Sequence, residues 1–279
     1  MKITRHFTTT ALALICGFLA IAQEESQPAK DKIEVKAGVY YNTGLNYYGR
    51  TDSLRSSGFF PLLEFWVNSK FYMNAAPVFV MNSETPFDYA GTVTSIGYRT
   101  SDTRSAFNIY FVKPFYEKSS QLVQSALKGQ AAASYSWLNK ILNITAGGDV
   151  KFSDKTDFGV SGGIDHLIRK EWGGPAVFVI DPMATINAGT QQFTKTYYKQ
   201  SSFLFFPGVD QTVTEKVSNF NILSYEFSMA MVYAKGKMQL IFTPAYVIPQ
   251  NLVTVANRPD LSERGRNMFY ATLGAKIIL

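Results

Sequence analysis

Few side chains in this 279-residue chain have the chemistry of a catalytic centre. His166 is the single histidine beyond the N-terminal segment, and a hydrolase would need it as the base beside a nucleophile. Asp157, at the other end of the same predicted strand, is about 30 Å away along that strand. The two side chains cannot act together. Metal-ligand spacing, a G-x-S-x-G motif and a phosphate loop are also missing, so the sequence predicts no enzyme, metal site or cofactor.

A larger group of reactive side chains consists of charged residues that alternate with apolar ones. They fall on the face opposite an apolar stripe, and in lipid a midplane arginine or lysine would cost about 2–4 kcal/mol. We therefore expect an aqueous interior to receive these side chains: Lys36, Glu64, Asp149, Lys151, Asp157, Asp165, Arg169, Asp181, Glu226 and Lys276. Together they could bind a small polar solute, or the acids could bind a cation. A packed or water-filled interior with mutual counter-charges is the ordinary alternative.

The elements that would position these charges are strands with a period of two. From Leu142 to Phe152, apolar residues or glycine occupy the even positions, and polar residues or glycine occupy the odd positions. Similar patterns predict eight strands at 33–48, 57–68, 70–82, 88–100, 104–113, 129–138, 140–152 and 156–169. A ninth strand starts at 175, a tenth ends at 234, an eleventh starts at 237, and the twelfth is 266–279. Prolines lack a ladder donor, so bulges or kinks are expected at Pro61, Pro77, Pro182 and Pro244.

The final segment, 266–279, has apolar residues at every odd position from Phe269 to Leu279. A strand of this kind separates two different solvents on its two faces. It is either the edge of a soluble β-sandwich or the seam of a closed barrel. In the barrel it would pair with the first strand, around Val35 to Tyr41.

The lengths of the connections decide between these alternatives. Connections after the second, fourth, sixth, eighth and tenth strands are short and rich in turn residues. Longer ones come after the first, fifth, ninth and eleventh strands, at 49–56, 114–128, around 200–210, and 251–265. Those after the third and seventh strands are short exceptions. Long loops at one end and tight turns at the other are typical of an outer-membrane barrel, whereas a sandwich has no reason to sort its loops.

The residues near the N-terminus predict that the protein is exported. Lys2 and Arg5 precede an apolar stretch that ends in a small-x-small cleavage site at Ala22. Cleavage after Ala22 removes the single cysteine, Cys16, and leaves +4 of the formal net charge of +6, which gives no ground for nucleic-acid binding. No later apolar run approaches the length of about 18 residues that a transmembrane helix needs. We expect a signal peptide at 1–22, a flexible periplasmic lead at 23–32 and one barrel domain at 33–279.

Two of the long connections have patterns of their own. Leu122, Val123, Ala126 and Leu127 have helical spacing within 114–128 and predict a short amphipathic helix over the barrel mouth, with a disordered loop as the alternative. The segment 190–217 predicts a hairpin that rises above the membrane. Its apolar run 203–206 could contact a partner or fold inward as a plug.

Four segments, at 148–152, 189–194, 246–251 and 258–264, resemble those of the uncharacterised outer-membrane β-barrel proteins common in Bacteroidetes envelopes. None of them is a catalytic motif, so the resemblance implies a location and an architecture without a substrate. Barrels of the outer membrane usually end on Phe, which the barrel-assembly machinery recognises. This chain keeps an apolar residue there, Leu279, without the aromatic ring.

The sequence therefore predicts an all-β membrane protein, a closed antiparallel up-and-down transmembrane β-barrel of about twelve strands with a short helix in one external loop. The expected location is the Gram-negative outer membrane, with membrane lipid and the assembly machinery as partners. The leading functional hypothesis is a passive channel or binding barrel for a small polar solute. The alternative is a structural or surface-adhesion barrel that presents its loops, and a lipid-processing or proteolytic barrel comes third.

Overall fold

The computed structural model describes residues 33–117, 120, 122–171, 174–192, 219–253 and 262–279. The predicted signal peptide at 1–22, the lead at 23–32 and most of the predicted hairpin at 190–217 lie outside the described residues. Within the described part, no helix is long and apolar enough to cross a membrane.

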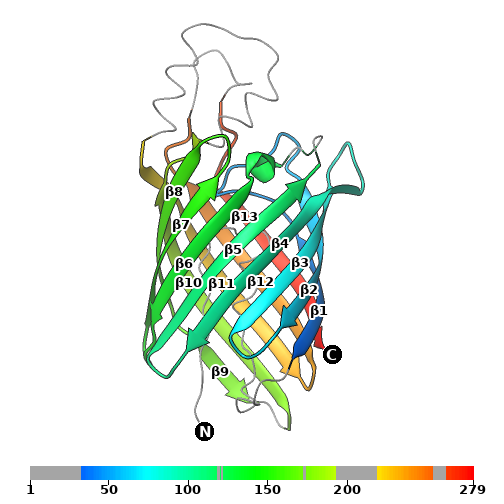
Figure 1. Ribbon diagram of the computed structural model, residues 1–279, viewed down its shortest axis with the longest axis vertical. Helices are drawn as coiled ribbons and strands as arrows, with labels where there is room; N and C mark the ends of the chain where they lie inside the picture. Colours follow the sequence, from blue (N-terminus) through cyan, green and yellow to red (C-terminus); the bar gives the residue numbers. More distant parts are fainter. Residues whose placement is uncertain (1–32, 118–119, 121, 172–173, 193–218, 254–261) are drawn as a thin grey trace, which may run out of the picture.

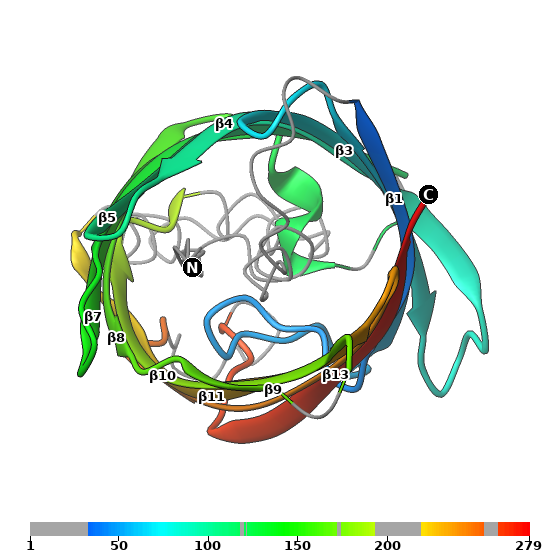
Figure 2. The same cartoon turned by 90° about the horizontal axis from the view of Figure 1, so that it is seen from below.

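One antiparallel sheet closes on itself to form the barrel (Figures 1 and 2). Its strands are β1 (Glu34–Asn42), β2 (Ser57–Trp66), β3 (Phe71–Met81), β4 (Asp88–Ser101), β5 (Ser105–Tyr116), β6 (Gly129–Trp137), β7 (Asn143–Phe152), β8 (Thr156–Asp165), β9 (Ile168–Glu171), β10 (Ala176–Gly189), β11 (Asn221–Lys235), β12 (Met238–Pro249) and β13 (Met268–Ile278). Both β8 and β9 pair with β10, so β9 continues β8 and the wall has twelve strand positions. The predicted closed up-and-down barrel is confirmed.

The barrel closes at a seam between β1 and β13. Lys36 to Asn42 pair antiparallel with Ile278 to Thr272, and β1 pairs with β2 along its other edge. The Asn42 Nδ2 atom donates to Thr272 Oγ1 at 3.0 Å, which adds a side-chain bond across the seam. The predicted pairing of the last strand with the first is therefore confirmed.

The outer face of the barrel is apolar. On it, large apolar side chains are exposed along strand after strand, among them Val39, Leu63, Ile96, Ile109, Phe111, Ile144, Phe158, Val160, Ile186, Phe227, Leu240, Leu273 and Ile277. A continuous apolar surface of this extent would be unstable in water, and it matches the lipid-facing band of a transmembrane barrel.

Aromatic rings gather on the outer face near both ends of the strands. Near one end they are Phe59, Phe79, Phe87 and Tyr89, and near the other Phe71, Tyr98, Tyr135 and Trp137. Transmembrane barrels place aromatic girdles at both membrane interfaces. The two groups therefore mark the two edges of the lipid-facing band.

The connections differ between the two ends, as the sequence predicts. At the short-turn end they are 67–70, 102–104, 138–142, 172–175 and 236–237. At the long-loop end they are 43–56, 82–87, 117–128, 153–155, 190–220 and 250–267, with 82–87 and 153–155 as the short exceptions. Figure 1 shows the described parts of the long loops together at the top, and the start of β1 and the C-terminus toward the bottom.

Prolines interrupt the ladder where the sequence predicts kinks. The predicted strand 156–169 is not continuous, because His166 and Leu167 separate β8 from β9. Pro182 of β10 lies opposite this break, and without an N–H it can only accept, from the His166 N–H at 3.2 Å. Pro61 and Pro244 also lie at gaps in the pairing of their strands with β3 and β11.

The first strand is shorter than the predicted segment 33–48, because the chain turns into the barrel after Asn42. The Asn42 Oδ1 atom accepts from the Gly44 N–H at 2.8 Å, and this bond starts the turn. Leu45 then joins the apolar cluster inside the barrel. Figure 2 shows the connection 43–56, in blue, inside the ring of strands.

The predicted amphipathic helix within 114–128 is not found among the described residues of that segment. Strand β5 continues to Tyr116, and the chain then forms a single 3-10 turn, η2 (Val123–Ala126), before β6. Leu122, at the N-cap position of this turn, makes no side-chain capping bond. Leu122 and Leu127, on either side of η2, are instead buried in the apolar cluster inside the barrel.

Candidate functional site

The inner face of the barrel receives the charged side chains that alternate with the lipid-facing ones. Eight of the predicted positions are buried: Lys36, Glu64, Asp149, Lys151, Asp157, Asp165, Glu226 and Lys276. The other two, Arg169 and Asp181, are half-buried near the short-turn end, where Arg169 pairs with the buried Val179. These charges divide between two sides of the lumen.

One side, formed by β13 and β1 to β4 and here called the basic wall, has more cations than acids. Lys276 Nζ lies 3.3 Å from Glu64 Oε1, and Trp66 Nε1 donates to Glu64 Oε2 at 3.2 Å. Lys36 Nζ lies 2.8 Å from Glu34 Oε1 and 4.9 Å from the centre of the Trp66 ring. The Glu64 carboxylate is thus held by an ammonium and an indole, and a second ammonium lies over that indole.

Arg99 belongs to the basic wall and is missing from the predicted set. Its side chain is buried and lies beside Asn108 of β5, whose Oδ1 accepts from the Tyr72 hydroxyl at 3.1 Å. Inward positions of β4 include Gly97, where an added Cβ would meet the Tyr72 ring. Because this glycine shows no polarity, the alternation of β4 is weak in the sequence. Counting every second residue from Val93 would have found Arg99.

The opposite side, formed by β7, β8, β10 and β11 and here called the acidic wall, has more acids than cations. Lys151 and Asp149 form a buried ion pair on β7. On β8, Asp157 accepts a bond from the Gln192 N–H at 2.7 Å. The strand order places β8 six positions from β2 in the ring of twelve, so the acidic wall faces the basic wall across the lumen.

The remaining acids of this wall accept bonds from neutral donors. Asn143 Nδ2 donates to Asp165 Oδ2 at 2.7 Å near the short-turn end. The Tyr270 hydroxyl donates to Glu226 Oε1 at 3.0 Å nearer the long-loop end. A neutral donor stabilises a carboxylate without cancelling its charge, so these two contacts do not offset the excess of acids on this wall.

The interior is not uniformly polar, contrary to the sequence-based expectation. A buried apolar cluster covers the inner face of β1 to β5 and includes Tyr40, Phe60, Leu62, Val78, Tyr110 and Val112. The stretch 59–63 of β2 is apolar on both faces, so its inward residues cannot be told from its lipid-facing ones by periodicity.

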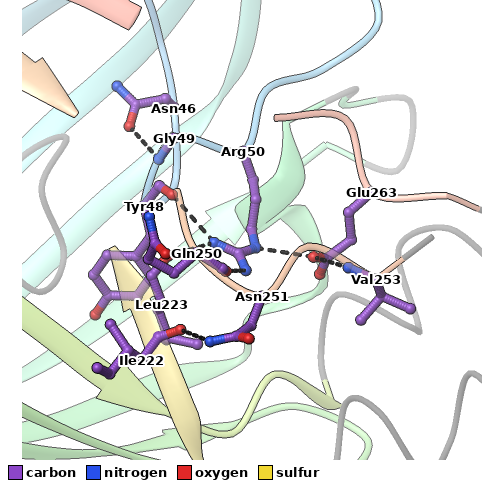
Figure 3. A network of polar contacts seen from close by, with 10 residues as sticks. All are labelled: Asn46, Tyr48, Gly49, Arg50, Ile222, Leu223, Gln250, Asn251, Val253 and Glu263. Carbon is purple, nitrogen blue, oxygen red and sulfur yellow. Dashed lines mark hydrogen bonds and ion pairs between the residues drawn. The ribbon is translucent and has the colours of Figure 1, made fainter. Parts of the chain in front are cut away.

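A network centred on Arg50 joins the connections at the long-loop end (Figure 3). The Arg50 side chain is fully buried, and its Nε donates to Glu263 Oε2 at 3.1 Å. Its Nη1 donates to the carbonyl oxygens of Tyr48 and Leu223, both at 3.1 Å, and its Nη2 donates to that of Gln250 at 3.0 Å. One side chain therefore links the connection 43–56 to the start of β11 and to both ends of the connection 250–267.

Further bonds fix the same end of the lumen. The Thr51 N–H donates to Arg264 O at 2.8 Å, and Glu263 Oε2 also accepts from the Val253 N–H at 3.0 Å. Gln124 of η2 donates from Nε2 to Asn46 O at 3.3 Å. The inward connection 43–56 is thus tied to two other connections, so it forms a built constriction of the mouth.

Gly49 and the two tyrosines before it shape this constriction. Gly49 has φ +77°, and an added Cβ would lie 2.8 Å from Pro249, so the close approach requires glycine. The Tyr47 and Tyr48 ring centres are 4.4 Å apart, and burial raises the pKa of both hydroxyls well above the ordinary value. Lys151 Nζ lies 5.9 Å from the centre of the Tyr48 ring, which connects the mouth to the acidic wall.

His166 occupies a structural position. Its Nδ1 lies 2.6 Å from the carbonyl oxygen of Ile141 in a short turn, and its backbone N–H donates to Pro182. Asp157 lies at the opposite end of β8. Across the described residues, no group of three or more His, Cys, Asp or Glu side chains could hold a metal ion.

A closed barrel with an apolar outer band, two aromatic girdles and charged inner walls defines the outer-membrane class of transmembrane β-barrels. No protein-family model matches the chain, and no curated protein matches it. The resemblance to Bacteroidetes barrels therefore stays a prediction.

Among solved structures, the chain is similar to the KdgM porin, at 7% identity and a TM-score of 0.46 over 87% of this chain and 98% of that one. The NanC porin matches at 9% identity and a TM-score of 0.44, over 89% and 100% of the two chains. LpxR from Salmonella typhimurium matches at 8% identity and a TM-score of 0.49, over 87% of this chain and 99% of that one. At TM-scores below 0.5 these likenesses carry no argument about function, which must come from the chain's own side chains.

Proposed function

We propose that the protein is a passive channel or binding barrel for a small polar solute in the outer membrane. The observation that supports this most is the pair of oppositely charged inner walls. Buried ion pairs can often be replaced by apolar residues without loss of stability, so a barrel that only needed a packed interior has no use for them. Charges on both walls instead offer hydrogen bonds and ion pairs to water or to a polar solute.

The dimensions and the mouth limit what could pass. Eight strands are just filled by their own side chains, so twelve leave more room along the axis. The connection 43–56 and η2 lie inside the ring at the long-loop end and narrow it (Figure 2). A solute that enters from this end must be small, or it must bind at the constriction.

Single-channel recording in planar bilayers tests this proposal. We expect discrete conductance steps and, under a KCl gradient, a reversal potential that shows a weak preference for cations, because acids outnumber bases on the inner face. Asp165→Asn should reduce this preference, whereas Lys113→Gln on the outer face of β5 should leave it unchanged. A folded barrel that shows neither conductance nor glycerol entry into proteoliposomes contradicts the channel proposal.

A second candidate is a structural or adhesion barrel that presents its long loops. The Arg50 network favours it, because a rigid base under the connection 250–267 would suit the display of a binding surface. Deleting residues 193–218 separates the candidates. Solute flux should survive the deletion if the barrel is a channel, and binding to a surface partner should be lost if the loops carry the function.

A barrel enzyme is the least favoured proposal, because His166 contacts a backbone carbonyl rather than a nucleophile. A lipase or protease activity that is lost in the His166→Ala protein would reverse this order. Partners such as outer-membrane lipid and the barrel-assembly machinery follow from the proposed location.

A further inference from the structure

Every connection at the short-turn end has an exposed cation in it or beside it. Lys70, Arg104 and Lys140 lie in the first three turns, Lys170 lies on β9, and Lys235 and Lys237 flank Gly236 in the last turn. We call this set the basic rim. Exposed acids in the described part of these connections are few, and one of them, Asp102, uses its carboxylate to accept bonds within its own turn.

The backbone of the turns holds the rim in place. Asn68 Oδ1 accepts from the Lys70 N–H at 2.8 Å, and Asp102 Oδ1 accepts from the Arg104 N–H at 2.7 Å. Asn139 Oδ1 stabilises the turn around Lys140 in the same way. None of the ion pairs among the described residues involves Lys70, Arg104, Lys140, Lys235 or Lys237, and Arg104 is attracted by Asp102 within its own turn.

Large apolar side chains stand next to these cations. Ile141 is 81% exposed beside Lys140, and Phe71 is 51% exposed beside Lys70. Side chains of this kind are stable only where the acyl chains of the membrane begin. The neighbouring ammonium groups then lie at the depth of the lipid headgroups, where long basic side chains extend toward phosphate.

Among the described residues, the excess of exposed cations is smaller at the long-loop end. The exposed cations there are Arg55, Lys113, Lys128, Lys155, Arg264 and Arg266, and the exposed acids are Glu84, Asp88, Glu117 and Asp154. There, Lys128 Nζ lies 2.7 Å from Asp154 Oδ1, and Lys113 Nζ donates to the carbonyl oxygen of Lys128 at 2.8 Å. The charge asymmetry therefore distinguishes the two membrane interfaces.

We propose that the basic rim binds the headgroups of anionic phospholipids in the leaflet at the short-turn end. Phosphate oxygens accept charge-assisted bonds from ammonium and guanidinium groups, and an anionic surface attracts each basic residue near it. The rim would select anionic lipid for the shell around the barrel and set the depth of the barrel in the bilayer. This surface lies outside the lumen, so it does not rest on the proposed channel.

Trp137 gives a natural reporter, because it is 52% exposed on the lipid face and pairs with Ser105 between the turns that carry Arg104 and Lys140. In a Trp172→Phe background, the tryptophan fluorescence that lipid can quench comes from Trp137, because Trp66 is buried on the inner face. This fluorescence is measured in vesicles of brominated phosphatidylcholine mixed with increasing phosphatidylglycerol. We expect phosphatidylglycerol to displace the quenching lipid with about five-fold preference. The double variant Arg104→Gln/Lys140→Gln should lower this preference to about one.

The matched control is Lys128→Gln/Lys155→Gln at the long-loop end, which should keep the full preference. With the rim unsubstituted, the quenching curve obtained with phosphatidylglycerol is compared with the curve obtained when unbrominated phosphatidylcholine dilutes the brominated lipid. Equal curves overturn the proposal. A preference for phosphatidylglycerol that survives in the Arg104→Gln/Lys140→Gln variant also overturns it. If that variant does not fold, as judged by heat-modifiable migration on a gel, a salt titration of the parent protein decides. The preference should vanish in about 1 M salt, where screening acts within about 3 Å, and a preference that persists there overturns the proposal.

Discussion

The two ends of the barrel are stabilised by contacts of different range. At the short-turn end, Asn68, Asp102 and Asn139 each accept bonds from backbone N–H groups two or three residues further on. At the long-loop end, Arg50 bonds to Leu223 and Glu263, which are 173 and 213 positions away in the sequence. A short turn is fixed by its own residues, whereas the mouth is fixed by remote ones.

This difference follows from the entropy of ordering. A long connection has more conformations to lose than a tight turn, so a few strong contacts must offset a larger cost. A buried guanidinium that donates to a carboxylate and three carbonyl oxygens is a contact of that strength. The mouth should therefore be sensitive to single substitutions that the opposite end tolerates.

The substitution expected to lower the free energy of unfolding most is Arg50→Met. The substitution breaks the buried ion pair between Arg50 and Glu263, and breaking a buried pair by removing one partner typically costs about 3–5 kcal/mol. Urea unfolding in lipid vesicles, followed by tryptophan fluorescence, measures the loss. In planar bilayers, the same variant should show noisier conductance steps, because the connection 43–56 is released from its anchors.

Two controls sharpen this prediction. Arg55→Met changes an exposed arginine of the same connection and should alter the free energy of unfolding by less than about 0.5 kcal/mol. The double variant Arg50→Met/Glu263→Met removes both charges and should recover part of the loss. An Arg50→Met protein as stable as the Arg55→Met protein would show that the mouth does not depend on this network.

A glycine in each end allows a smaller, matched comparison. Gly49 and Gly236 both have positive φ, +77° and +57°, but an added Cβ meets Pro249 only at Gly49 and meets nothing within 4 Å at Gly236. Gly236→Ala should cost about 1–2 kcal/mol for the left-handed backbone alone. Gly49→Ala should cost clearly more in the same unfolding assay. Equal losses would mean that the packing at the mouth can relax.

The smallest effect is expected at Asp102, and it depends on pH. Backbone N–H groups of Arg104 and Ser105 hold the pKa of the exposed Asp102 carboxyl below its ordinary value of 3.8. A carboxyl whose pKa is lowered by folding stabilises the folded protein at a pH above its unfolded pKa. This contribution is lost as the pH falls through the pKa of the folded state. Asp102→Asn should therefore be slightly less stable near neutral pH, and the difference should shrink below pH 3.8. A difference that stays constant down to acid unfolding would mean that the charge contributes nothing.

The sequence predicted the wall of the barrel better than its contents. The strands, the seam and the sorting of loops follow from period-two patterns and turn residues, which are local properties. The Arg50 network could not be predicted, because its partners are remote in the sequence and its acceptors are mostly backbone carbonyls. Arg99 and the inner apolar cluster were missed where glycine or two-sided apolarity hides the alternation.

The inward charges that the sequence placed on the lumen side, such as Lys36 and Lys276, lie on strands whose outer face is clearly apolar. In the segment 114–128, where the sequence predicts a short amphipathic helix, the described residues form only the 3-10 turn η2. Leu122 and Leu127, two of the apolar residues at helical spacing, are buried in the apolar cluster inside the barrel.

The seam between β1 and β13 also sets an order of events during folding. Asn42 bonds to Thr272, which is 230 positions further along the chain, so the ring cannot close until the last strand is available. Contacts between residues this far apart make folding slow. Until closure, the edges of β1 and β13 expose rows of backbone donors and acceptors that can pair with another chain. Any delay of the final strand would therefore favour aggregation over closure.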